Sequence, residues 1–555
     1  MLTPRAAVTL RPSQSADRVQ MDYTGSPNEA TLFTDALLPV LLVASAALTA
    51  PLSLVLLSFY RRAVVRVMAG RAGASNPATH ATAAHAPPAA ALEVELLDPA
   101  AIARADVPAY ERALRSLTSA TLVYVVAGFA YAVVLTSPYA VIAEDGVPLP
   151  RVLWLLSCYL WPAALAAGML AAVSWRQRLL VAAVYFAMLF AVAVFGFAVG
   201  SSVSGRDLAR FWLVTNAPAT VLLLAYLHRR VRAVGPLVLA FTAVAVTGCE
   251  LLLSVVGLSF AAMVLGLALF GVAGWWVLRV LARRYEQRRT SDQALTLDAM
   301  WLLFGVVQSF AFGLRGWAWI FTGFLGFAAY KLVAGLGFGF AGLAGQERSG
   351  PSLLLLRVFA LGARSERLFD ALSKRWLRAG SVWMIAGPDL ASSAVEPSEF
   401  LDYMAGRLSS RFIRGDEDLD RRIRGIERGP DSDGRYRVNA FFCYADTWRQ
   451  AVKRLAASAD AVLMDLRTFS QANQGCLFEL QQVLASVPLD RVVFLIDDAS
   501  DRALLESVLQ ASWRDLDADS PNRRLATPRA RLVHVSEEAV EDAAGIVKLL
   551  MARAE

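Results

Sequence analysis

Cysteine and charge are both scarce in this chain of 555 residues. Only 18% of the residues are charged, against roughly a quarter in soluble domains, and 56% are hydrophobic. The cysteines have no CxxC spacing and no neighbouring histidine; they are Cys158, Cys249, Cys443 and Cys476. This spacing argues against a disulfide framework or a zinc site, and it fits a reducing cytoplasm for the C-terminal part.

Common catalytic motifs are also missing. The sequence contains no Walker loop, no HExxH and no GxSxG elbow, so none of the chemistries that depend on them is indicated. The formal net charge is +7, but the Lys and Arg excess lies mainly in short loops between apolar runs. Membrane topology explains that distribution better than nucleic-acid binding does, so no nucleic-acid partner is expected.

Long apolar runs fill the chain before residue 345 and indicate a multi-pass protein of the cell membrane, with the lipid bilayer as its partner. A helix needs about 20 largely apolar residues to cross a bilayer. Residues 234–278 are roughly twice that long, so a tight hairpin is expected to turn around Gly257. About nine spans are expected within 36–345, in Ala36–Tyr60, Leu117–Ala143, Val152–Trp175, Leu179–Gly200, Phe211–Leu227, Val234–Leu278, Thr296–Gly313 and Trp317–Gly342.

Arginines gather in alternate loops, after the first, third, fifth and seventh expected spans. The positive-inside rule then places the N-terminus, with its polar tail 1–35, outside and the C-terminus in the cytoplasm. The first cytoplasmic loop covers residues 61–116. Its Ala-, Pro- and His-rich part, 74–91, is expected to be a flexible linker, and residues 100–117 an amphipathic stretch on the membrane surface.

Several features of the expected spans are open to more than one interpretation. An acidic residue such as Glu250 often marks an ion path, but a hydrated carboxylate near the outer interface is favoured. Asn216 with Pro218 suggests an unwound transporter helix or, preferably, a simple proline kink. The glycines between Gly335 and Gly345 favour close helix packing over a nucleotide loop.

Strand-like and helix-like segments alternate from residue 351 to residue 555. This alternation predicts a cytoplasmic α/β domain, with a doubly wound parallel sheet of flavodoxin-like type and helices on both faces. The charged segment 411–437 is interpreted as an exposed insertion, and Asp431-Ser432-Asp433-Gly434 within it as a turn. The expected strands are 353–361, 382–386, 438–444, 461–466, 491–496 and 531–535.

Ligands of such sheets bind at the carboxyl ends of the strands, near the point where strand order reverses. Each residue that this rule selects also has an ordinary interpretation as a turn residue. The selected residues are Gly362, Arg364 and Ser365 after the first strand, Asp389 after the second, and Asp465 and Arg467 at the end of strand 461–466.

Glu479 stands at the edge of an apolar helical stripe that includes Cys476 and Val483. Partial desolvation there raises the pKa of a carboxyl group unless a cation or a donor compensates. Such a group can act as a base or as a hydrogen-bonding partner of a sugar. A structural ion pair with Arg467 is the alternative.

The C-terminal 200 or so residues resemble Toll/interleukin-1 receptor (TIR) domains. The resemblance rests on the strand and helix order and on segment 469–480, where Cys476 and Glu479 match the Cys-x-x-Glu spacing of that family. It implies a flavodoxin-like sheet and, in the enzymatic branch, NAD hydrolysis with the glutamate engaging the nicotinamide ribose. The segment 473–475 departs from the serine and tryptophan usual there, and the first strand ends in Leu361-Gly362-Ala363.

Three functions remain open for a membrane-anchored signalling or effector protein of this design. The α/β domain binds or hydrolyses a nucleotide such as NAD, with Cys476 and the loop after the first strand as ligand contacts and Glu479 as the catalytic residue. Alternatively, it is a catalytically silent assembly or regulatory module, which includes self-association through the TIR-like domain. In the third case the membrane half is a transporter or channel that this domain regulates.

Overall fold

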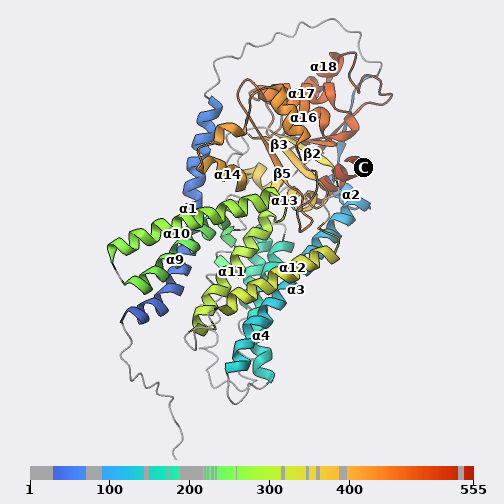
Figure 1. Ribbon diagram of the computed structural model, residues 1–555. Helices are drawn as coiled ribbons and strands as arrows, with labels where there is room; N and C mark the ends of the chain where they lie inside the picture. Colours follow the sequence, from blue (N-terminus) through green and yellow to red (C-terminus); the bar gives the residue numbers. More distant parts are fainter. Residues whose placement is uncertain are drawn as a thin grey trace, which may run out of the picture.

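The computed structural model describes most of the chain. The described ranges are 29–69, 90–142, 149–172, 175–187, 234–257, 259–313, 321–344, 349–357, 363–386, 397–426, 428–535 and 543–554, with isolated residues between them. Figure 1 shows a helical bundle beside an α/β domain, which the C-terminal part of the chain dominates. Outside the described residues lie the tail 1–28, the linker 70–89, most of the fourth and fifth expected spans, Asn216, Gly362 and Asp389.

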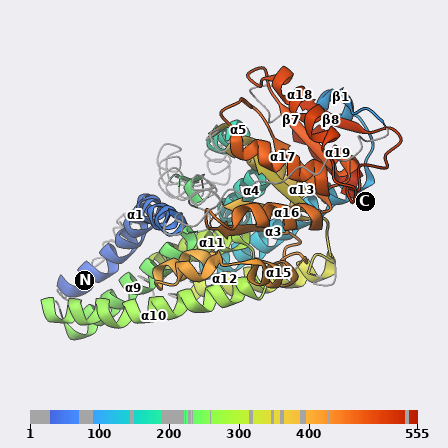
Figure 2. The ribbon, with the colours of Figure 1, turned by 90° about the horizontal axis from the view of Figure 1, so that it is seen from above.

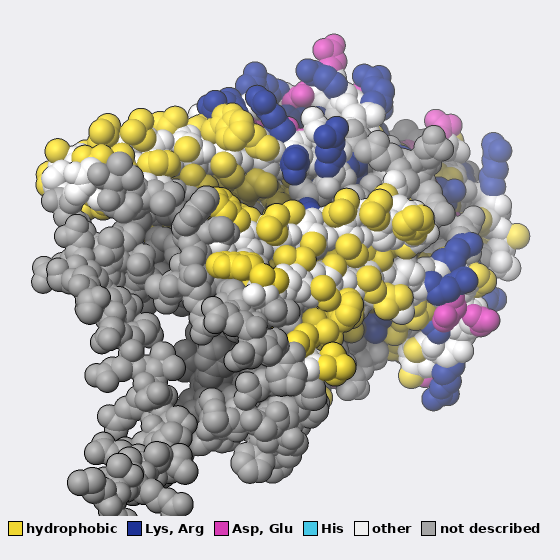
Figure 3. Space-filling view, turned by 60° about the horizontal axis from the view of Figure 1, so that its bottom comes forward, with side chains coloured by type: hydrophobic (Ala, Val, Ile, Leu, Met, Phe, Trp, Pro, Cys, Tyr) yellow, Lys and Arg dark blue, Asp and Glu magenta, His cyan; other side chains and the backbone are white. Residues whose placement is uncertain are grey.

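The bundle consists of long helices. Their bounds are α1 Glu29–Ala69, α3 Pro108–Ile142, α4 Leu149–Ala171, α5 Trp175–Ala187, α9 Gly235–Val256, α10 Phe260–Glu286, α11 Asp292–Gly313 and α12 Thr322–Phe340. Within the described residues, three helical segments are long and apolar enough to cross a membrane, namely Pro108–Pro138, Phe260–Glu286 and Thr322–Phe340. Figure 3 shows apolar side chains covering much of the bundle surface, with Lys and Arg gathered beyond its end.

The hairpin expected around Gly257 is confirmed. Helix α9 ends at Val256, and Gly257 turns the chain with a φ of 93°, a conformation that favours glycine. Ser259 caps α10, because its hydroxyl accepts a hydrogen bond from the Ala262 amide at 3.1 Å. The two helices then pack closely, and a side chain at Gly248 would collide with the Phe270 ring.

An aromatic core holds α3, α11 and α12 together. Tyr131, Trp301 and Tyr330 are all buried, and the Tyr131 and Trp301 ring centroids lie 4.6 Å apart. The Tyr131 hydroxyl donates to the Trp301 carbonyl at 3.1 Å. This hydrogen bond satisfies the Tyr131 hydroxyl, whose ring is otherwise surrounded by apolar groups.

All strands of the sheet run parallel, as the sequence predicts. Their order is β1-β8-β7-β6-β2-β3-β5-β4. Within it, β3-β2-β6-β7-β8 has the flavodoxin-like 2-1-3-4-5 order, with the reversal of strand order between β2 and β6. The bounds are β1 Glu93–Leu97, β2 Ser352–Arg357, β3 Ser381–Ala386, β4 Phe412–Ile413, β5 Val438–Cys443, β6 Ala461–Asp465, β7 Val492–Ile496 and β8 Arg529–His534.

Helices cover both faces of the sheet (Figures 1 and 2). One face packs against α16 (Trp448–Ser458), α17 (Gln474–Ser486) and α18 (Arg502–Arg514). The other packs against α13 (Ala363–Trp376), α19 (Ala543–Ala554) and the first turns of α3. Strands buried on both sides are continuous apolar runs for this reason. Near the far edge, α14 (Pro397–Met404) and α15 (Asp416–Arg424) complete the domain.

A segment of the loop between the first two expected spans belongs to the α/β domain, which sequence reasoning missed. Strand β1 pairs with β8, and α2 (Pro99–Ala103) packs against α19. The side chains of Gln510 and Trp513 donate to the carbonyls of Leu92 and Ala90, at 2.7 and 2.9 Å. Val107, Tyr110 and Ala113 are buried in the same core, so the apolar face expected on the membrane surface is covered by the α/β domain instead.

Helix α1 makes a second contact between the bundle and the α/β domain. Its Leu57, Tyr60 and Val64 pack in one cluster with Phe400 of α14 and Phe412 of β4. The Tyr60 and Tyr403 rings meet edge to face, with centroids 5.4 Å apart. The chain beyond the expected first span therefore continues as helix and supports the far edge of the sheet.

Candidate functional site

The carboxyl edge of the sheet brings Asp465 and Arg467 together. Asp465 ends β6, where strand order reverses, and its register partner on β2 is Arg357. The Arg467 guanidinium donates to both Asp465 carboxylate oxygens, with N–O distances of 2.8 and 2.7 Å. Each side chain is only 3% exposed. The pair forms a buried fork, the geometry in which Arg and a carboxylate bind each other most strongly.

Glu479 and Cys476 lie on the buried side of α17. Each is 2% exposed, so the carboxylate expected at the edge of the apolar stripe is inside the domain. Burial, together with the charges of Glu479 and Asp465, raises the pKa of the Cys476 thiol to about 12. Cys476 is therefore a neutral thiol at physiological pH and a poor nucleophile.

The ion pair at this edge differs from the one considered in the sequence analysis. Arg467 is held by Asp465, whereas the alternative considered from the sequence paired it with Glu479. Arg364 and Ser365 lie in the first turn of α13, as expected for an anion-binding loop, but their side chains are outside the described part of the chain. Gly362 and Asp389 are not described, so their predicted role stays a prediction.

The loop after β6 is held by its neighbour after β7. Thr468 has a φ of 60°, and its amide donates to the Asp497 carboxylate at 2.9 Å. Ser500 bridges the two loops, because its hydroxyl donates to the Leu466 carbonyl and to Asp497. Asp497 therefore acts as a turn acceptor here.

A second polar centre joins the α/β domain to the bundle. It consists of residues 428–437, called here the junction loop, and of the turn between α10 and α11. Asp433 is fully buried, and its carboxylate accepts hydrogen bonds from Ser291 at 2.7 Å and from Tyr124 at 3.4 Å. Arg378 donates to the Asp433 carbonyl at 2.5 Å. Asp433 thus contacts α3, the start of α11 and the end of α13 at once.

Gly434 lets the junction loop approach the bundle. Its φ is 77°, which favours glycine, and a side chain there would stand 3.0 Å from Leu343 and 3.3 Å from the Ser116 hydroxyl. The turn expected for residues 431–434 is confirmed, because the Gly434 amide donates to the Asp431 carbonyl at 2.9 Å.

Three arginines complete this junction. Arg437 donates to the Asp431 carboxylate at 2.9 and 3.1 Å, and its guanidinium lies over the Tyr285 ring, 3.8 Å from the centroid. Arg435 forms an ion pair with Asp292, the first residue of α11. From the bundle side, Arg288 donates to the Gly429 carbonyl.

The charged segment 411–437 is therefore not an exposed insertion, and that interpretation was wrong. It contains β4 and α15, and its Asp431, Asp433 and Arg435 are buried. Opposite charges from distant parts of the chain neutralise each other there, which permits burial of so many ionised groups.

A pocket opens beside the junction, between the bundle and the α/β domain. Its empty space, part of it open to solvent, is about 450 Å³. Every charged side chain that the structure places in its wall is basic. The lining residues are Leu117, Met169, Leu170, Arg178, Gln293, Lys374, Arg378 and Arg435.

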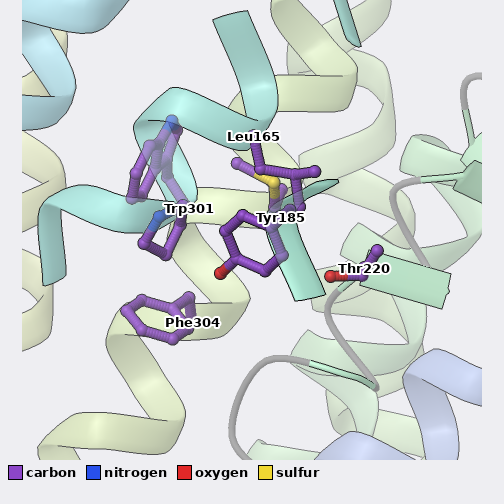
Figure 4. A pocket seen from close by; sticks show the side chains of 7 residues that line it. Leu165, Tyr185, Thr220, Trp301 and Phe304 are labelled. Carbon is purple, nitrogen blue, oxygen red and sulfur yellow. The ribbon is translucent and has the colours of Figure 1, made fainter. Parts of the chain in front are cut away.

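Another pocket lies inside the bundle and is mainly apolar (Figure 4). It has about 290 Å³ of empty space. Tyr185, Thr220, Trp301 and Phe304 surround it, together with Pro162, Leu165 and Met300. The described helices also contain an ion pair that sequence reasoning missed, between Lys331 of α12 and Asp298 of α11 at 2.7 Å. Asp298 escaped notice because it stands beside the expected start of its span.

The described residues hold no group of three or more His, Cys, Asp or Glu side chains that could bind a metal ion. Glu250 lies in α9, but its side chain is outside the described set. Comparison with known proteins adds no assignment: no family model matches the chain, and no curated protein matches it.

Proposed function

We propose that this is a membrane-anchored signalling protein whose α/β domain is a regulatory module, catalytically silent and coupled directly to the membrane helices. The observation that carries the proposal is the buried junction around Asp433. A domain that serves only as a tethered enzyme needs a linker, whereas this one shares a polar core with α3, α10 and α11. A change in helix arrangement would therefore reach the sheet without an intermediate partner.

The burial of Glu479 and the pairing of Arg467 with Asp465 support catalytic silence over NAD hydrolysis. A catalytic glutamate has to contact the ribose of its substrate, but Glu479 is 2% exposed and Asp465 occupies the Arg467 guanidinium. The 2-1-3-4-5 strand order agrees with the flavodoxin-like fold that the TIR resemblance implies. The proposal therefore keeps a TIR-like fold and the use of the α/β domain as an assembly module. It also includes about nine membrane spans, an external N-terminus and a cytoplasmic α/β domain.

The transport alternative has weaker support. It predicts a polar path around Glu250 or Asn216, which both lie outside the described side chains. The pocket within the described bundle is lined mainly by apolar and aromatic side chains. We therefore place regulation by the α/β domain ahead of transport.

The proposal is tested by incubating the full chain in detergent with NAD, beside Glu479→Gln. The full chain is required because β1 and the start of α3 complete the core of the α/β domain. We expect no nicotinamide release above the protein-free control from either protein, also when the protein is concentrated. Nicotinamide release that Glu479→Gln abolishes would overturn catalytic silence and restore the enzymatic interpretation.

A further inference from the structure

The pocket beside the junction combines positive charge with restricted access to water. Arg178, Arg378 and Arg435 are each no more than 9% exposed, and Lys374 is half-buried beside them. They come from four places in the chain: α5, α13, the segment after α13 and the junction loop. Four cations that converge on one cavity make it attractive to an anion.

Two acidic side chains, Asp292 and Asp433, lie close to Arg378 and Arg435. Asp292 pairs with Arg435, and the Asp433 carboxylate accepts from Ser291 and Tyr124. Arg378 contacts neutral acceptors, the Asp433 carbonyl and the Gln293 side chain. Burial lowers the pKa of Arg378, the charge of Asp433 opposes this effect, and the like charge of Arg435 adds to it. An anion in the pocket would raise this pKa again.

The surroundings of the pocket suit the surface of a membrane. Leu117 in its wall stands near the start of the apolar part of α3. Directly after Arg178, helix α5 exposes Leu179, Leu180 and Val184, which are 46%, 62% and 52% exposed. Acyl chains can lie along such residues while a headgroup enters the basic pocket.

We propose that this pocket binds a phosphate group, held by Arg178, Lys374, Arg378 and Arg435 between the bundle and the α/β domain. Guanidinium and ammonium groups are the usual protein partners of phosphate. The exposed leucines favour the headgroup of an anionic phospholipid as the source of that phosphate. The inference is independent of whether the α/β domain regulates the bundle.

The test uses the full chain, delipidated in an uncharged detergent at low salt. Its melting temperature is measured at increasing concentrations of phosphatidylglycerol, phosphatidylcholine or inorganic phosphate, each added separately. The key variant is Lys374→Gln, because Lys374 is only half-buried, whereas the three arginines of the pocket are buried. The matched control is Lys453→Gln, which removes the same charge from an exposed site on α16.

We expect phosphatidylglycerol to raise the melting temperature and phosphatidylcholine to have little effect. In Lys374→Gln the concentration for a half-maximal shift should rise about tenfold, the usual effect of losing one charged hydrogen bond. A response to inorganic phosphate alone would support the phosphate site and assign it to a soluble ligand.

The absence of any shift with all three additions would overturn the inference, and the wild-type series decides this even if a variant fails to fold. Equal responses of Lys374→Gln and Lys453→Gln would also overturn it, because general surface electrostatics would then explain the binding.

Discussion

Single buried charges determine how the two halves of this molecule meet. Asp431 and Asp433 stand in a charged run, and a run of that kind is normally solvated. Asp433 is buried against partners more than a hundred residues away, Ser291 and Tyr124. Asp431 is buried beside Arg437, whose own partner Tyr285 is also more than a hundred residues away. Local sequence contains no record of such partners, so sequence reasoning identified the turn but not its position in the structure.

Asp431 should make stability depend on pH. Burial raises the pKa of its carboxyl group from 3.8 to about 7, against the opposing effect of Arg437. Because the folded state then binds the proton more tightly than the unfolded state, this contribution is complete below pH 4 and is lost as pH rises through 7. We expect the melting temperature of the full chain to fall between pH 5.5 and 8.

Substitution of this residue separates its titration from that of other groups. Asp431→Asn should flatten the decline, while Asp519→Asn, at an exposed position, should leave it unchanged. An unchanged slope in Asp431→Asn would assign the pH dependence to another group.

The candidate site at the carboxyl edge was predicted in part. The topological rule selected Asp465 and Arg467, which the structure places at and just after the carboxyl end of β6; their role in ligand binding stays a prediction. It could not decide which acid holds Arg467, since side-chain pairing depends on loop geometry that the sequence pattern does not specify. The stripe on α17 indicated burial for Cys476, and the same face proved deep enough to bury Glu479.

Among the secondary structure elements, strong apolar runs were predictable and weak ones were not. Every strand expected after residue 350 is present within a few residues, and the central strands β3, β6 and β7 are buried along their whole length. Strand β1 was missed because it alternates Glu93 and Glu95 with apolar residues and follows a segment of linker-like composition. It is a strand because it pairs with β8 at the edge of the sheet.

The segment around β1 should contribute measurably to stability. Leu92 is 4% exposed in the core of the α/β domain, so Leu92→Ala should lower the free energy of unfolding by about 2–5 kcal/mol. Leu96, on the same segment, is 47% exposed, and Leu96→Ala should cost far less. Denaturant unfolding of the full chain measures both. Equal small effects would show that residues 90–97 do not belong to the domain.

At the scale of the whole molecule, the division into an apolar and an α/β half was visible in composition. The contacts between the two halves were not visible in the composition. The contacts that join them include α1 with α14, the first turns of α3 with α13 and α19, and the junction loop with the α10–α11 turn. These contacts combine segments that are far apart in the chain, and two of them involve stretches interpreted as an amphipathic segment on the membrane surface or as an exposed insertion.

The most direct test of this coupling is a double-mutant cycle on Asp292 and Arg435, the ion pair that joins α11 to the junction loop. The free energy of unfolding is measured for the full chain, Asp292→Asn, Arg435→Gln and the double variant. The exposed pair Arg502 and Glu506 serves as the control cycle, for which a coupling of a few tenths of a kcal/mol is usual. We predict a coupling of about 1–3 kcal/mol for Asp292 and Arg435. Effects that add within about 0.5 kcal/mol would contradict a buried junction between the membrane helices and the α/β domain.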